Sequence, residues 1–328
     1  MTTSRSLFIG PSGGIVFILL GMFCISINDM LIKQLSGDYP LHEMVFVRSA
    51  IGITFSLLLV RLEGGWAILR PRRPWLHVLR GLMIVFSNMA FFTALAVMPL
   101  ADATALFFVA PLFITLLSVP FLGETVGLRR IGAVLVGFLG VLVMLGPGAE
   151  IGQGLPSRWV LLLPVVGAFG YACMQILTRK LGVTTKASAM AVYIQGMFLL
   201  VGAAFFLVAG DGRFAEGQSN ESLIFLLRAW VWPAPEDAWL FAALGAMSAI
   251  VGYALSQAYR LGDAATIAPY EYAGLPLAVM WGYLIFGTLP GVSTGIGIAL
   301  IMGSGLFVFL RERALQAETA GGRPVRRY

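Results

Sequence analysis

The feature that most constrains this chain is a succession of apolar runs, each long enough to cross a lipid bilayer as a helix. The hydrocarbon core of a bilayer requires about 20 mostly apolar residues per helix, whereas transmembrane strands are alternating segments of about 10 residues. The sequence therefore predicts an all-α integral membrane protein with ten transmembrane helices. Their approximate bounds are 14–35, 42–62, 75–97, 101–122, 128–146, 158–180, 188–209, 238–260, 264–286 and 293–312.

The composition excludes the soluble classes of protein. Charged residues make up 12% of the chain and hydrophobic residues 59%, whereas a soluble protein carries about 25% charged residues. Too few polar side chains are available to cover a core of this size in water, so a soluble enzyme, a nucleic-acid-binding protein and a disordered chain are excluded. The expected partners are the lipid bilayer and a small-molecule substrate, with no nucleic acid.

The distribution of lysine and arginine predicts the orientation. If the N-terminus is cytoplasmic, alternate connections collect 17 of the 22 basic residues. Cytoplasmic loops are enriched in Lys and Arg, so both termini are expected in the cytoplasm of a bacterial inner membrane. The longest outer connection, 210–237, contains an apolar piece too short to span, which we expect to lie as an interfacial helix. The basic residues assigned to the cytoplasm are Arg5, Arg61, Arg70, Arg72, Arg73, Arg80, Arg129, Arg130, Arg179, Lys180, Lys186, Arg260, Arg311, Arg313, Arg323, Arg326 and Arg327.

Short matches indicate that the chain repeats itself. They occur in the same order in both halves, and they predict a first repeat over 1–148 and a second over 149–328, which includes the insertion near 210–237 and a short cytoplasmic tail. Five helices per repeat is an odd number, so the second repeat must enter the membrane from the opposite side. The matched pairs are Asn28–Lys33 with Gln175–Lys180 and Val45–Arg48 with Val192–Gln195, both 147 residues apart, Pro99–Ala103 with Arg260–Ala264, 161 apart, and Phe121–Glu124 with Ile285–Thr288, 164 apart.

The repeat resembles a known family. Leu100–Thr104, Pro111, Phe121–Glu124 and the helix Arg129–Val141 look like the EamA repeat of the drug/metabolite transporter superfamily. The second copy departs from the first where Thr288 replaces the acidic residue. The resemblance implies a ten-helix transporter whose substrate binds near the midplane, between spans one to four and six to nine, with spans five and ten peripheral. Members of this superfamily move amino acids, riboflavin, adenosylmethionine, other metabolites and drugs.

Inverted halves favour alternating access, because they can open one central site first to one side and then to the other. Ionisable groups inside the membrane are the best candidates to line that site. Asn28 and Asp29 lie in the outer half of span one, and Arg48 lies six residues into span two. Arg48 either binds an anionic group of the substrate or forms a structural pair with Asp29, and the sequence leaves both interpretations open.

Glu271 is the second ionisable candidate, about two turns into span nine. Pro269, Gly274 and Pro276 surround it, so a kink is expected there. Its carboxylate could bind an amine or a proton, which makes Glu271 and Asp29 the protonation candidates. A locally capped or snorkelling glutamate is the structural alternative.

Amide and aromatic side chains complete the candidate substrate-binding set. Repeat-related positions tend to face the same cavity, although buried amides also join helices without any functional role. Mid-span tyrosines could stack on a ring or a cation, whereas those near span ends are usually interfacial. The amides are Asn88, Gln175, Gln195 and Gln257, and the tyrosines are Tyr193, Tyr253 and Tyr272.

These features predict a secondary active transporter, not an enzyme, for a small polar or zwitterionic metabolite such as an amino acid or a cofactor-like molecule. Protons are a candidate coupling ion, no cofactor or metal is expected, and monomer and homodimer both remain open. The alternatives are a drug/metabolite exporter of broad specificity, a membrane-embedded lipid-modifying enzyme and a passive channel. An enzyme would need a clustered catalytic set, but His42 and His77 lie apart near span ends, and a channel would show rings of like charge.

Overall fold

The protein is a bundle of membrane-length helices. The computed structural model describes residues 11–123, 127–146 and 158–320, and no strand occurs in these ranges. In chain order the helices are α1 (Pro11–Leu35), α2 (Leu41–Glu63), η2 (Trp66–Leu69), α3 (Pro74–Leu95), α4 (Leu100–Phe107), α5 (Ala110–Leu122), α6 (Leu128–Leu145), η3 (Arg158–Leu161), α7 (Leu162–Gly182), α8 (Ala187–Ala209), α9 (Glu221–Leu227), η4 (Pro235–Asp237), α10 (Ala238–Leu261), α11 (Ala264–Ile267), η5 (Ala268–Ala273), α12 (Gly274–Phe286) and α13 (Val292–Ala320).

The predicted class, an all-α integral membrane protein, is confirmed. Within the described residues, seven helical segments are long and apolar enough to span a membrane. They are Gly13–Leu35, Leu41–Glu63, Pro74–Leu95, Leu100–Leu122, Trp159–Gly182, Ala187–Ala209 and Pro235–Leu261. Two shorter apolar helices, Ile131–Leu145 and Val292–Phe307, coincide with most of the fifth and tenth predicted spans. The ninth predicted span, 264–286, is divided among α11, η5 and α12.

The fourth and ninth spans are both interrupted midway. α4 ends at Phe107 and α5 begins at Ala110, while the 3₁₀ segment η5 separates α11 from α12. The α-helix is therefore interrupted around Glu271, where a kink is expected. The spacing between matched residues grows from 161 to 164 across this span, and η5 lies within the interval where it grows. Three added residues equal one turn of 3₁₀ helix, so the extra length of the second repeat is consistent with the turn that holds Glu271.

The two interrupted spans end in the same way. Gly123 after α5 and Gly287 after α12 both adopt the left-handed conformation, with φ of 72° and 64°. A left-handed residue closes a helix at low strain only when it is glycine. The sequence match between Phe121–Glu124 and Ile285–Thr288 thus includes a shared helix cap. Glu124 itself, which Thr288 replaces in the second copy, lies outside the described residues.

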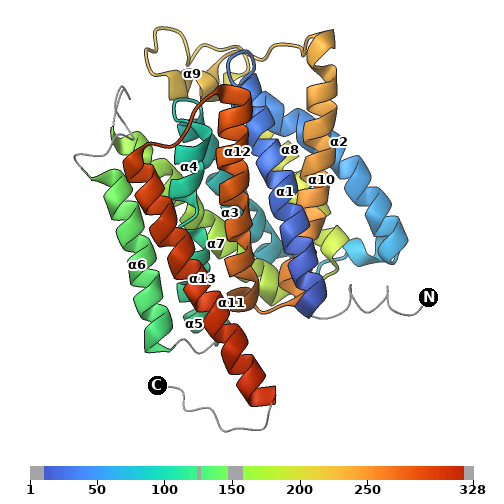
Figure 1. The fold of residues 1–328 in the computed structure, drawn as a ribbon. Helices are drawn as coiled ribbons and strands as arrows, with labels where there is room; N and C mark the ends of the chain where they lie inside the picture. Colours follow the sequence, from blue (N-terminus) through green and yellow to red (C-terminus); the bar gives the residue numbers. More distant parts are fainter. Residues whose placement is uncertain (1–10, 124–126, 147–157, 321–328) are drawn as a thin grey trace.

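The helix contacts pair the two halves of the chain. The most extensive ones join α1 with α10, α3 with α7, α2 with α8 and α6 with α13. Matching helices by their order in each half exchanges α1 with α7, α2 with α8, α3 with α10 and α6 with α13. This exchange turns the α1–α10 contact into the α7–α3 contact and leaves the other two unchanged. Figure 1 shows α6 and α13 together on one flank, and the start of α1 and the end of α13 at the same end of the bundle.

The segment between α8 and α10 covers the other end, called here the outer end (Figure 1). A short helix is present as expected, capped by Asn220 Oδ1, which accepts a hydrogen bond from Ser222 N at 3.0 Å. Arg228 donates to the carbonyl oxygens of Ser36 and Gly37 in the α1–α2 connection. The insertion therefore binds back onto the first half of the chain. Its location at a lipid interface stays a prediction.

Candidate binding cavity

A cavity of about 1030 Å³, measured with the open space at its mouth, lies inside the bundle. Its lining residues come from α1, α2, α3, α4, α5, α7, α8, α10 and η5. Among the described residues, neither α6 nor α13 contributes to the lining. Both halves of the chain therefore build one cavity, and both interrupted spans reach it.

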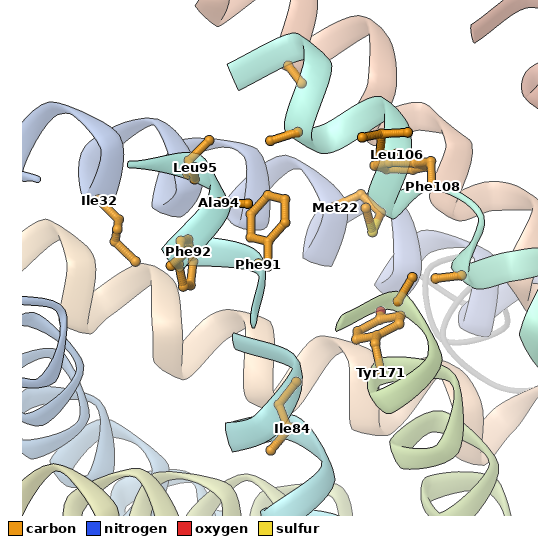
Figure 2. Close-up of a cluster of buried hydrophobic side chains, with 14 of the residues drawn as sticks. Met22, Ile32, Ile84, Phe91, Phe92, Ala94, Leu95, Leu106, Phe108 and Tyr171 are labelled. Carbon is orange, nitrogen blue, oxygen red and sulfur yellow. The ribbon is translucent and has the colours of Figure 1, made fainter. Parts of the chain in front are cut away.

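Most of the wall is apolar and aromatic. Figure 2 shows Met22, Phe91, Phe108 and Tyr171 approaching one another from separate elements, and all four line the cavity. The rings of Phe107 and Tyr171 lie 5.5 Å apart between centroids. Such a wall suits a flat or apolar part of a ligand, while the few polar groups fix its orientation.

Near the outer end, Arg48 joins three helices, in what we call the outer group: Asn28, Asp29, Arg48 and Asn88. Arg48 Nη1 donates to Asn28 Oδ1 at 2.9 Å, and Nη2 donates to Asn88 Oδ1 at 2.7 Å. Its guanidinium also lies 5.0 Å from the centroid of the Phe198 ring, a cation–π contact. Two neutral amides thus hold Arg48. Among the described residues no direct ion pair joins it to Asp29, which also lines the cavity.

Glu271 anchors the middle group, which consists of Tyr171, Gln175, Tyr259 and Glu271. Glu271 Oε1 accepts hydrogen bonds from Tyr259 Oη at 2.6 Å and from Tyr171 Oη at 3.0 Å. Gln175 Nε2 donates in turn to Tyr171 Oη at 2.7 Å. The carboxylate is 2% exposed and lines the cavity. It is therefore held in place from α7 and α10, which excludes a snorkelling glutamate.

Arg80 is a cavity residue that the charge distribution alone places among the cytoplasmic basic residues. It lies inside the predicted span 75–97, and that position was the available signal. Its side chain is 1% exposed and lines the cavity. Nε donates to Thr178 Oγ1 at 2.6 Å, Nη1 to the carbonyl oxygen of Met190 at 3.0 Å, and Nη2 to Ser256 Oγ at 3.0 Å. Arg80, Thr178 and Ser256 form the inner group, opposite the outer end.

Several buried polar atoms of the cavity wall have no hydrogen-bond partner among the described residues. They are Asn28 Nδ2, Arg48 Nε, Ser87 Oγ, Thr104 Oγ1 and Gln175 Oε1. A buried polar atom without a partner costs about 1–3 kcal/mol. Both donors and acceptors occur in this set, so a ligand with groups of both kinds would satisfy them.

The remaining predicted site residues separate into two classes. Gln195 lines the cavity but is bonded through Nε2 to Ser248 Oγ at 3.0 Å. Four others are absent from the lining. The Tyr193 ring packs on His77, Tyr253 Oη donates to Glu63 Oε1, Gln257 Oε1 accepts from Arg260, and Tyr272 packs near Phe108.

The structure thus brings Asn28, Asp29, Arg48, Asn88, Gln175, Gln195 and Glu271 to one cavity. This lining contains two guanidinium groups, when Arg80 is included, and two carboxylates, within an aromatic wall. Such a set can hold a molecule that has both an anionic and a cationic group. Among the described residues no group of three or more His, Cys, Asp and Glu side chains could hold a metal ion.

Residues 12–146 match the EamA-like transporter family. The chain is 30% identical over 308 residues to a riboflavin transporter of Rhizobium johnstonii, covering 94% of this chain and 91% of the relative. It is 28% identical over 300 residues to an S-adenosylmethionine uptake transporter of Rickettsia prowazekii, covering 92% and 93%. A pseudopaline exporter of Pseudomonas aeruginosa is 30% identical over 290 residues, covering 88% and 93%.

A solved crystal structure gives independent support for the fold. It superimposes with a TM-score of 0.67 at 21% identity, covering 92% of this chain and 98% of the other. The helical bundle and the bacterial relatives together identify a multi-pass bacterial membrane protein. The chain therefore belongs to the EamA-like transporter family, within the drug/metabolite transporter superfamily, and is a transporter of small metabolites, not an enzyme.

Proposed function

We propose that the protein is a secondary active transporter that carries a zwitterionic metabolite with an aromatic or heterocyclic ring. The observation that supports this most is the lining of the cavity inside the bundle. Arg48 offers a cation for a carboxylate, and Asp29 and Glu271 offer anions for an ammonium or another cationic group. Arg–carboxylate pairs are among the strongest polar contacts, and the phenylalanine and tyrosine rings provide surfaces for stacking.

The named relatives support this substrate class. S-adenosylmethionine has an amino-acid moiety, a further cationic centre and a purine ring, and riboflavin has a polar chain on a ring system. S-adenosylmethionine thus combines a carboxylate, cationic groups and a ring, whereas riboflavin shares the ring and the polar groups but has neither a carboxylate nor an ammonium. We therefore place the substrate among amino-acid-like or cofactor-like metabolites that contain a ring.

Alternating access is the proposed mechanism. The repeats 1–148 and 149–328 would act as two inverted halves, with the substrate bound between them. The helix contacts support this division because they are preserved when the helices of the two halves are exchanged in order. Interrupted helices are tolerated at membrane depth where they line a cavity, and both interrupted spans do so here.

The proposed setting is the bacterial inner membrane with both termini in the cytoplasm. Arg70, Arg72, Arg73 and Lys186 lie in the connections at the end opposite α9, and cytoplasmic connections are enriched in such residues. Glu271 and Asp29 are the proposed protonation sites if transport is coupled to protons. Because named relatives comprise uptake and export proteins, the test covers both directions.

The test is uptake and efflux by the purified protein in liposomes, with and without a pH gradient. The labelled panel contains S-adenosylmethionine, riboflavin, aromatic amino acids and a ring-free amino acid. Saturable transport of a ring-containing member, faster than that of the ring-free amino acid, is expected. Saturable transport of the ring-free amino acid alone, or turnover of the lipid instead of transport, would contradict the proposal.

A further inference from the structure

Arg80 is a buried cation with neutral partners only. Its three nitrogens bond to two hydroxyl groups and one carbonyl oxygen. Among the described residues, no Asp or Glu oxygen lies within 4.0 Å of them. A charge buried without a counter-charge is strongly unfavourable. An uncharged donor such as glutamine could serve neutral acceptors at a lower desolvation cost, so hydrogen bonding to these helices does not by itself account for the arginine.

The position of Arg80 in the cavity suggests why a positively charged side chain is present there. It shares the cavity with Arg48, whose partner Asn88 lies eight residues further along α3. At 1.5 Å per residue, the two positions on α3 are about 12 Å apart along the helix. One cavity therefore contains two guanidinium groups near opposite ends, with Glu271 between them in the middle group. A substrate carboxylate that leaves Arg48 and moves along the cavity toward the inner end therefore meets a second cationic side chain, Arg80.

We propose that Arg80 is a second carboxylate-binding residue of the transport path, and that the carboxylate of the substrate replaces its bonds to Thr178, Ser256 and the Met190 carbonyl. This inference rests on the proposed function. Those three acceptors lie on α7, α8 and α10. A bidentate carboxylate binds guanidinium more strongly than neutral acceptors do. Its arrival would therefore release α3 from the three helices at the inner end, which couples substrate position to opening of that side.

The first experiment compares two probes that differ only in the carboxylate, S-adenosylmethionine and its decarboxylated form. Transport of each is measured in liposomes for the wild-type chain, Arg80→Gln and Arg80→Lys. Arg80→Gln is expected to raise the half-saturation concentration for S-adenosylmethionine about tenfold or more, the size of one lost charge-assisted hydrogen bond. The value for the decarboxylated probe should change less than about twofold, and Arg80→Lys should restore part of the difference.

The matched control is Arg61→Gln, which removes the same charge from an exposed position in the last turn of α2. It should leave both values unchanged. If Arg80→Gln affects the two probes equally, Arg80 only ties helices together and the proposal is wrong. If Arg80→Gln does not fold, Ser256→Ala and Thr178→Val are used to test the proposal instead. They remove competing acceptors, so the half-saturation concentration for S-adenosylmethionine should fall, whereas a purely structural role predicts slower transport of both probes.

A second measurement separates this inference from the proposed substrate class. Phenylglyoxal, which modifies arginine, is applied to the membrane face that exposes the α2–α3 connection, and the modified residues are located by mass spectrometry. Arg80 should react, and S-adenosylmethionine should slow that reaction more than its decarboxylated form does. If the wild-type chain transports neither probe, the proposed substrate class is wrong. The reactivity of Arg80 with phenylglyoxal then still tests whether Arg80 lies on the transport path. An unreactive Arg80 in the folded wild-type protein would overturn its place on the path.

Discussion

Arg48 is held by two asparagines from two different helices, with its guanidinium against the rings of Phe92 and Phe198. These contacts fix the direction of the side chain and leave Nε without a partner among the described residues. Arg48→Ala should therefore raise the half-saturation concentration of the transported compound about tenfold or more, because a charge-assisted hydrogen bond contributes about 1.5–3 kcal/mol. Concentration-dependent uptake in liposomes measures this change.

The control for this variant is Arg213→Ala. Arg213 lies in the exposed outer connection, where its side chain is 59% exposed and its Nε is 3.7 Å from Asp211. Exposed pairs of this kind contribute about 0–1 kcal/mol, so transport should be unchanged. Equal transport by wild type, Arg48→Ala and Glu271→Gln would show that the binding residues are assigned wrongly.

Glu271 can be tested without disturbing its hydrogen bonds. In Glu271→Gln, the amide oxygen still accepts from Tyr171 and Tyr259, while the negative charge and the proton-binding group are lost. We expect the thermal unfolding temperature to stay close to the wild-type value and the stimulation of transport by a pH gradient to disappear. Uptake measured at several imposed gradients checks this result.

Glu221→Gln is the matched control for Glu271→Gln, because Glu221 is exposed in the first turn of α9. It should keep the full response to the gradient. An undiminished response in Glu271→Gln would exclude Glu271 as the coupling site and would leave Asp29 as the candidate.

The polar candidates were predictable where a charged or amide group interrupted an apolar run. Arg48, Asp29 and Glu271 interrupt such runs, and all three line the cavity. The depth of a residue in the membrane and the direction of its side chain were harder to predict. Arg80 lies inside α3 and not in a loop, while Tyr253 and Gln257 bond to Glu63 and Arg260 and are absent from the cavity lining. Which face of a helix a residue occupies depends on packing against neighbours, which hydropathy does not report.

At the scale of elements, the α6–α13 pair is a close contact that lies apart from the cavity. A Cβ atom added at Gly140 would lie 2.9 Å from the backbone oxygen of Gly297. Gly140→Ala should force the two helices apart and destabilise the protein by about 1–3 kcal/mol. Because neither helix lines the cavity in the described residues, the half-saturation concentration should not change. Thermal unfolding and transport are measured on the same preparation.

Gly132→Ala provides the comparison within the same helix. A Cβ atom there meets nothing within 4 Å, so the substitution should leave stability unchanged or raise it by up to about 1 kcal/mol through helix propensity. Equal loss of stability in both variants would mean that close packing of α6 on α13 is not the reason for glycine at position 140.

The elements were more predictable than the site. Each long apolar window of the sequence contains a helix where the structure describes it, and the prolines and glycines around Glu271 correctly indicated a break. The interruption between α4 and α5 was not anticipated, although Pro111 lies just after it. A single proline near a helix start is compatible with an unbroken helix, so tertiary contacts decide whether the helix is interrupted there.

At the scale of the whole molecule, one cavity built by both halves is the feature on which the mechanism depends. Alternating access requires that this cavity open to each side in turn. A channel would open to both sides at once, and a structural bundle would open to neither. Accessibility of a residue in the cavity wall distinguishes these three cases without knowledge of the substrate.

Ser87 is the position for this measurement, since it lines the cavity and its Oγ has no partner among the described residues. Ser87→Cys is made in a chain whose free cysteines, Cys24 and Cys173, are replaced by alanine. A membrane-impermeant thiol reagent is then applied from one face or the other. Alternating access predicts reaction from each face, with the transported compound on one side changing the two rates in opposite directions. Reaction from a single face under all conditions, or from neither face, would contradict it.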